Sequence, residues 1–299
     1  MKSILLPVEQ NTCVDAGFAA AALLANRFEA ETECIALKPS VVDFIAPDPV
    51  VVVLPQTGFT DAEAIKVARD RFDAFTAISG TAISGTAISG TAISGTATSG
   101  TATSGTATSG KSRLRWSSRQ PIDDAGLASL SRLFDITIVG RPGIGRNEPR
   151  MTTLEAALFE SGRPILMVPP NVPRTLGTNI LVHWNASTVT ARVINDAMPF
   201  LLRAEKVTLL SVDGNMVAGP RPAEMLEYLA RHGIKGSEAQ TRPANKGGAG
   251  EAILVEARKI GADLILKGAY TQSRLRQMVF GGATQHILQA SDIPVILSH

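Results

Sequence analysis

The C-terminal part of the chain alternates short apolar runs with stretches whose apolar residues recur every three or four positions. The apolar runs predict strands at residues 179–184, 207–212, 263–267 and 294–297, and a more polar strand follows the same rhythm at 238–242. The other stretches predict helices at 187–201, 222–232, 250–260 and 279–289. Pro199 must end or kink the first of these helices. Strands that alternate with helices predict a parallel sheet with helices on both faces.

The N-terminal part repeats this order of strands and helices, but its apolar and polar positions alternate less regularly. It predicts strands at 3–8, 33–37, 114–117, 135–139 and 164–168, and helices at 15–27, 61–75, 124–133 and 153–160. Two segment pairs align between the two parts: FDITIVGRPG with ADLILKGAYT, and SGRPILMVPP with SDIPVILSH. The sequence therefore predicts an internal duplication of one open α/β domain, with domains at 1–171 and 172–299 and a proline-containing linker at 169–173.

An uncharged low-complexity tract interrupts the first domain. Residues 76–110 consist of four TAISG and three TATSG pentapeptides. The pattern is similar to that of pentapeptide-repeat β-helices, in which the central aliphatic residue points into the coil. Seven repeats bury little apolar surface, and the last three carry Thr at the central position. We interpret the tract as a surface insertion in a loop rather than as a functional solenoid.

Composition narrows the function classes. The chain has 299 residues, 44% hydrophobic and 19% charged, with a formal net charge of +2 and scattered Lys and Arg, so it has no basic stripe of the kind that nucleic acids require. The longest aliphatic run, at 50–54, is far shorter than the ~20 residues of a membrane span. Two cysteines and an N-terminus without a signal-peptide pattern predict a cytoplasmic protein with neither nucleic acid nor membrane as partner.

The residues best suited to bind a ligand lie at one edge of the second predicted sheet. In open parallel sheets, ligands bind at the carboxyl ends of the strands. Residues 268–271 follow the fourth strand of the second domain, and Gly281 and Gly282 precede its last helix, where glycines and free N–H groups suit a phosphate. Asn185 and Ser187 follow the first strand, so an amide and a hydroxyl reach the same edge. No HExxH, GxSxG, Walker or CxxC motif is present, so we expect neither catalytic residues, nor a metal site, nor an enzyme.

On these residues the chain resembles the universal stress proteins, in the form of two tandem domains. Nucleotide-binding members of that family carry G-x2-G-x9-G-[S/T] after the fourth strand and an Asp after the first, on an adenine-nucleotide alpha-hydrolase-like fold with five strands and helices on both faces. The second domain keeps Gly268 and Gly281 in register. It has Thr271 where the second Gly belongs, Gly282 where the hydroxyl residue belongs, and Asn185 in place of the Asp.

The resemblance implies a degenerate site for ATP or another adenine nucleotide in the second domain. It implies that Asn185 and Val212 face the adenosine, while the phosphates lie near Gly268, Thr271, Gly281 and Gly282. Lys267 either adds positive charge to this site or reaches solvent.

In the first domain, the pattern departs further from the family. Glu9 stands at the Asp position, and residues 153–154 replace the Gly-Ser pair, so this domain is expected to be structural and to hold no triphosphate. Arg141 and Arg146 either attract an anion or are solvated.

Three functions stay open at this point. The first is a regulatory universal stress protein acting in the stress response, the second a nucleotide-independent interaction scaffold, and the third an adenylating enzyme on the same fold, whose phosphate-loop signatures are missing. We expect an unidentified protein partner and leave open a homodimer. His286, Cys13 and the segment 273–276 are weaker candidates, which we interpret as a surface histidine, an ordinary helix residue and a solvated loop.

Overall fold

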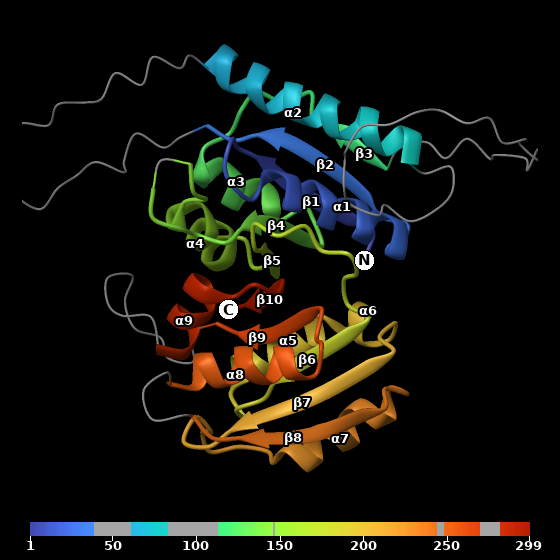
Figure 1. Cartoon of the computed structure of the whole chain (residues 1–299), viewed down its shortest axis with the longest axis vertical. Coiled ribbons are helices and arrows are strands. Elements are labelled where there is room, and N and C mark those ends of the chain that lie inside the picture. Colours follow the sequence, from blue (N-terminus) through green and yellow to red (C-terminus); the bar gives the residue numbers. More distant parts are fainter. Residues whose placement is uncertain (39–60, 83–112, 146, 244–247, 270–281) are drawn as a thin grey trace, which may run out of the picture.

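The computed structural model describes residues 1–38, 61–82, 113–145, 147–243, 248–269 and 282–299. Ten strands form a single sheet in the order β3-β2-β1-β4-β5-β10-β9-β6-β7-β8 (Figure 1). The strands are β1 (Ser3–Val8), β2 (Glu31–Ala36), β3 (Leu114–Trp116), β4 (Ile136–Gly140), β5 (Ile165–Val168), β6 (Asn179–His183), β7 (Lys206–Val212), β8 (Gly236–Thr241), β9 (Leu264–Gly268) and β10 (Val295–Ser298).

Helices cover both faces of this sheet, as the alternating pattern predicts. They are α1 (Val14–Phe28), α2 (Asp61–Ala82), α3 (Asp124–Ser131), α4 (Met151–Glu160), α5 (Thr188–Asp196), α6 (Met198–Leu201), α7 (Pro222–Arg231), α8 (Gly248–Lys259) and α9 (Gly282–Ala290). The buried side chains of α1, α2, α5, α6 and α7 form one core on one face, and those of α3, α4, α8 and α9 form a second core on the other. The α/β fold class predicted from the sequence is thus confirmed.

The two halves of the sheet have the same strand order and meet in an antiparallel seam. Within each half all pairs are parallel, whereas β5 and β10 run antiparallel to each other. The partners at the seam are Val295 with Met167, Ile296 with Leu166, and Leu297 with Ile165. In the repeat alignment Leu166 and Ile296 are equivalent, so a pseudo-two-fold axis passes through this pair.

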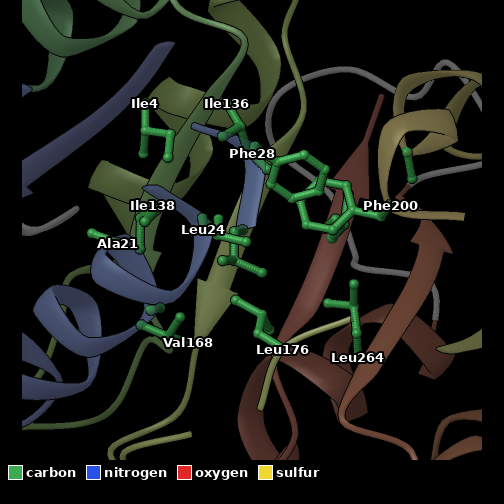
Figure 2. Packing of buried hydrophobic residues seen from close by; sticks show 14 of the residues in the cluster. Ile4, Ala21, Leu24, Phe28, Ile136, Ile138, Val168, Leu176, Phe200 and Leu264 are labelled. Atoms are coloured by element: carbon green, nitrogen blue, oxygen red, sulfur yellow. The ribbon is translucent and has the colours of Figure 1, made fainter. Parts of the chain in front are cut away.

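Side chains from both halves fill the space beside the seam. Phe28 of α1 packs edge-on against Phe200 of α6, with ring centroids 4.8 Å apart (Figure 2). Leu176, from the segment that joins the halves, is also buried in this core, together with Leu264 of β9 (Figure 2). Because one core spans both halves, we expect them to unfold together.

Proline shapes the start of the second half's helical layer. The Ser187 side chain accepts a hydrogen bond from the Thr190 N–H and caps α5. The predicted single helix over 187–201 is divided at Ala197, and Pro199 lies in the first turn of α6, where its missing N–H costs little.

The predicted end of the second helix is wrong. This helix was expected to stop before the pentapeptide tract, yet α2 continues to Ala82 and so includes the first seven tract residues. The Thr76 hydroxyl donates to the Phe72 carbonyl and extends the helix, while Phe75 stacks on Phe18 and anchors it. Residues 83–110 of the tract lie outside the described residues. Across the described ranges, every helix is too short or too polar to cross a bilayer.

Candidate functional site

The carboxyl end of β9 comes unusually close to the start of α5. A Cβ atom on Gly268 would lie 2.7 Å from both the Thr190 nitrogen and the Val189 carbonyl carbon. Those atoms belong to the backbone and cannot swing away, so only glycine fits at this position. Packing therefore requires a glycine at position 268, the first glycine of the predicted motif, whether or not this residue also contacts a phosphate.

Lys267, one residue earlier, is buried beneath this edge of the sheet. Its side chain is 5% exposed, and its Nζ donates to the Gly268 carbonyl and to Thr284 Oγ1, each at 3.0 Å. Among the described residues no carboxylate pairs with it, and burial lowers the pKa of its amine to about 8. The interpretation that this lysine reaches solvent is wrong, because the first turn of α9 covers it.

His183 ends β6 on the same face of the sheet as Lys267. It is 1% exposed, and its burial lowers the pKa of the imidazole to about 3. The nearby Lys267 charge acts in the same direction. His183 is therefore neutral over the physiological range, and Lys267 carries the positive charge of this buried pair.

Asn185 lies in a tight turn after β6. Its Oδ1 accepts hydrogen bonds from the Ser187 N–H at 3.2 Å and the Ser187 hydroxyl at 2.7 Å, while its carbonyl accepts from the Val217 N–H at 3.0 Å. Ala186 has a positive φ of 67°. A Cβ on Gly219 would approach the Ala186 oxygen to 2.7 Å. The amide oxygen of Asn185 is thus engaged within the protein.

The loop after β7 lies over this turn. The Trp184 indole N–H donates to the Pro220 carbonyl at 3.1 Å, which fastens the loop to the end of β6. Val212, the last residue of β7, is fully buried, and its carbonyl accepts from the Asn215 N–H. The loop therefore covers the edge where adenosine is expected.

The remaining residues of the predicted nucleotide site are only partly described. Gly282 opens α9 and is exposed, and no atom of the described residues lies within 4 Å of where its Cβ would be. Thr271, Gly281 and the segment 273–276 lie outside the described residues. The structure thus brings Asn185, Gly268 and the buried Lys267 to the carboxyl edge of β6 and β9, and the role of each in binding stays a prediction.

In the first half, an ion-pair network lies at the equivalent edge, at the carboxyl ends of β1 and β4. This network was not predicted from the sequence. The guanidinium of Arg150, the residue before α4, donates to Glu9 at 3.1 Å and to both carboxylate oxygens of Asp124 at 3.1 Å. Hydroxyls of Thr152 and Thr153 complete the shell around Asp124. Burial raises the pKa of Glu9, and Arg150 partly offsets this effect.

This network leaves little room in the first half. A cleft of about 30 Å³ remains at the ends of β1 and β4, lined by Glu9, Cys13, Gly140 and Arg150 among others. Since about 10–15 Å³ of such space holds one water molecule, the cleft has room for about two waters. Residues 9, 124 and 150 are far apart in sequence, and no local motif signals that they meet.

Two other candidates have structural roles. Arg141 reaches across the seam and donates to the Ser291 carbonyl at 3.1 Å, so the interpretation of a solvated arginine is wrong, while Arg146 lies outside the described residues. Cys13 is buried at the start of α1, and burial raises the pKa of its thiol, which agrees with an inert helix residue. His286 is half-buried, with its Cβ near Gly250 of α8. No cluster of three or more metal-ligating side chains occurs in the described ranges.

Comparison with known proteins finds a family match for the second half of the chain. Residues 179–299, from the start of β6 to the end of the chain, match the model of the universal stress protein family. The second half of the chain is thus similar to the universal stress protein family. The stress response protein NhaX of Bacillus subtilis (strain 168) is 36% identical over 52 residues, which make up 17% of this chain and 31% of NhaX. The chain therefore matches only about a third of that curated relative.

Solved structures extend the likeness to both halves of the chain. A universal stress protein from Archaeoglobus fulgidus DSM 4304 aligns over 99% of this chain and 97% of its own, with a TM-score of 0.63 and 14% identity. A functionally unknown protein from Pseudomonas aeruginosa PAO1 aligns over 100% and 92%, with a TM-score of 0.54 and 12% identity. At these identities, the likeness shows the shared fold.

Proposed function

We propose that this chain is a universal stress protein that acts as a cytoplasmic, non-enzymatic regulator in the stress response. We also propose that its second half binds ATP or another adenine nucleotide at the carboxyl ends of β6 and β9. Occupancy of that site would shift the protein between states that a protein partner distinguishes. The first half, with its edge filled by Arg150 and two carboxylates, serves as the structural support.

The buried Lys267 is the observation that carries this proposal. Its ammonium group lies under the first turn of α9, held by Thr284 and by the carbonyl of Gly268, without a carboxylate among the described residues. The N–H groups that open a helix also favour an anion. A positive charge buried beside a helix start is costly unless an anion compensates it, and the phosphates of a nucleotide would do so.

Denaturation of the purified protein tests whether nucleotide is bound. Adenine nucleotide released on denaturation is separated by chromatography, and ATP is titrated into the nucleotide-free protein by calorimetry. We expect released nucleotide or saturable heat, and Gly281→Val should abolish the binding. Absence of both signals would overturn the nucleotide proposal, and retained binding in Gly281→Val would show that the site lies elsewhere.

A variant that binds ATP more tightly is a sharper test than one that loses binding. Gly282→Ser restores the hydroxyl of the family pattern at a position with open space for a side chain. We expect it to strengthen ATP binding roughly tenfold, the effect of one charge-assisted hydrogen bond. Gly282→Ala is the matched control, because it adds the same Cβ without the hydroxyl. Equal affinities of the two variants would contradict a phosphate at this position.

A nucleotide-independent interaction scaffold is the second candidate function. The loop that covers Asn185 and the use of both oxygens of Asn185 within the protein favour it. An interaction scaffold would bind its partner equally well in the presence and absence of ATP, whereas a nucleotide-regulated protein would not.

A further inference from the structure

Strand β8 forms an outer edge of the sheet, and in the described part of the chain it pairs only with β7 (Figure 1). The ladder with β7 runs without a bulge from Gly236 to Thr241, and the strand contains no proline. The strand at the opposite edge, β3, spans only Leu114–Trp116. Proteins usually shorten, bulge or cover their edge strands, because an open edge pairs with other chains. Strand β8 therefore offers the longer open edge of the two.

The backbone groups that face this open edge belong to alternate residues. The Asp213 N–H donates to the Thr241 carbonyl at 2.9 Å, so Thr241 points its backbone groups toward β7. Successive residues of a strand direct their N–H and C=O groups to opposite sides. Glu238 and Gln240, together with Arg242 just after the strand, consequently direct theirs away from β7, where a further strand would pair.

Side chains of opposite charge flank Gln240 along this edge. Glu238 is exposed, and it has no ion-pair partner within the described ranges. Arg242 is 87% exposed at its side chain, and its Nε donates to Asp213 at 2.6 Å, which leaves the terminal nitrogens for a second carboxylate. Both charges lie on the face that α7 covers, because a Cβ on Gly236, two residues before Glu238, would meet a side chain of α7 at 2.8 Å.

This arrangement of charges is complementary to itself. A second copy related by a two-fold axis would pair with the edge in antiparallel direction. With the axis at Gln240, Glu238 of each copy lies directly opposite Arg242 of the other. With the axis at Glu238, two carboxylates would oppose each other, and with the axis at Ala239, neither charge would meet its opposite. Opposite charges across a strand pair stabilise it and like charges destabilise it, so the charges favour the axis at Gln240.

We propose that this chain forms a two-fold dimer through its β8 strands, with the axis at Gln240 and with Glu238 of each copy paired to Arg242 of the other. The two Gln240 residues exchange a pair of backbone hydrogen bonds at the axis. Because α7 lies over β8, the α7 helices of the two copies also approach each other and enlarge the interface (Figure 1). The proposal stands whether or not the second half binds a nucleotide.

Sedimentation equilibrium over a range of protein concentrations tests the charge pairing. We expect the native chain to show a monomer–dimer equilibrium. Glu238→Arg and Arg242→Glu should each weaken the dimer by about tenfold or more, because like charges then oppose each other twice in each dimer. An equimolar mixture of the two variants should associate again, since every pair in the mixed dimer is complementary. Asp70→Arg, at an exposed site on α2, makes the same charge change as Glu238→Arg and should leave the equilibrium unchanged.

Two further variants test the backbone pairing and the position of the axis. Gln240→Pro removes an outward N–H and spares the hydrogen bonds of Thr241 to β7, so it should abolish the dimer while circular dichroism shows a folded chain. Gln240→Cys places two thiols across the axis at a Cα separation of about 5.5 Å, which a disulfide spans, so oxidation should link the two chains. Glu238→Cys and Ala239→Cys should not link them. The two native cysteines are buried.

Several outcomes would overturn the proposal. A native chain that stays monomeric at every concentration would leave the β8 edge to a different partner. A dimer that persists in a folded Gln240→Pro variant would have its interface elsewhere. Cross-linking at position 238 or 239 in place of 240, or failure of the two charge variants to associate when mixed, would contradict the axis and the pairing of Glu238 with Arg242.

Discussion

Leu166 of β5 lies directly opposite Ile296 of β10, and the internal repeat makes these two residues equivalents of each other. An antiparallel pair of equivalent residues is the geometry of a two-fold axis, here within one chain. The two halves consequently share one sheet and the core beside the seam, so we expect the stability of each half to depend on the other.

Phe28→Ala tests this shared core. Phe28 is 2% exposed, packs against Phe200 and lies under the Arg203 guanidinium at 4.9 Å from its ring centre. We expect a loss of about 3–5 kcal/mol in the free energy of unfolding, with a single transition retained. Urea denaturation followed by fluorescence and circular dichroism measures both. Leu133→Ala, at an exposed site, is the control and should change stability by less than about 0.5 kcal/mol. Separate transitions for the two halves would contradict a shared core.

The buried amine of Lys267 predicts a distinct pH dependence of stability. Its pKa is about 8 in the folded protein, against about 10.4 in an unfolded chain. Between these values the unfolded chain binds the extra proton, so stability should rise as the pH increases from about 8 to 10 and be lowest, for this group, below 8.

Lys267→Met removes that titration and keeps a side chain of similar length. We expect the variant to be more stable than the native protein at pH 7, by an amount on the order of 3 kcal/mol, with the difference shrinking above pH 8. Chemical denaturation of both proteins from pH 6.5 to 10 measures the difference between their free energies of unfolding. Groups that titrate equally in both proteins cancel in this difference. Parallel pH profiles would contradict a buried lysine with a lowered pKa. The same variant should bind ATP more weakly if the lysine charge serves the nucleotide site.

Much of the fold could be predicted from the sequence because its apolar runs and helical spacings agree with the final structure. The duplication was visible because the fourth and fifth strands of each half, around Gly140 and Gly268, keep their flanking residues. The site was less predictable. The burial of Lys267 depends on how α9 packs, and the meeting of Glu9 with Arg150 joins residues 141 positions apart. Both are tertiary relations that a local pattern does not encode.

Arg150→Met tests the network that fills the edge of the first half. Arg150 is 17% exposed at its side chain and bridges Glu9 and Asp124, whose side chains are 18% and 13% exposed. Its removal leaves two neighbouring carboxylates without their cation, and should cost about 3–5 kcal/mol at neutral pH. The loss should diminish on acidification, as the carboxylates become protonated. Arg150→Lys should recover only part of the stability, because one ammonium cannot form the paired hydrogen bonds to Asp124. Thermal and urea unfolding at two pH values measure these effects, and full recovery by lysine would argue against the bridging geometry.

Two glycines at the candidate nucleotide site should respond oppositely to alanine. In Gly268→Ala the new methyl group meets the backbone of α5 at 2.7 Å, so we expect a loss of about 1–3 kcal/mol or more. In Gly282→Ala the methyl group meets no atom of the described residues at the start of α9, and stability should be unchanged or slightly higher. Calorimetric melting of both variants makes the comparison. Unchanged stability of Gly268→Ala would contradict the close approach of β9 to α5.

The antiparallel seam also limits how this chain can assemble. Each half has one inner edge strand, β5 or β10, and the two edges hydrogen-bond to each other. The edge by which one half alone would join a second copy is therefore already occupied within the molecule. Among the described strands, only the outer strands β3 and β8 leave a sheet edge through which a homodimer of the full chain could pair. The tandem chain is, in effect, a dimer whose two subunits can never dissociate or exchange partners.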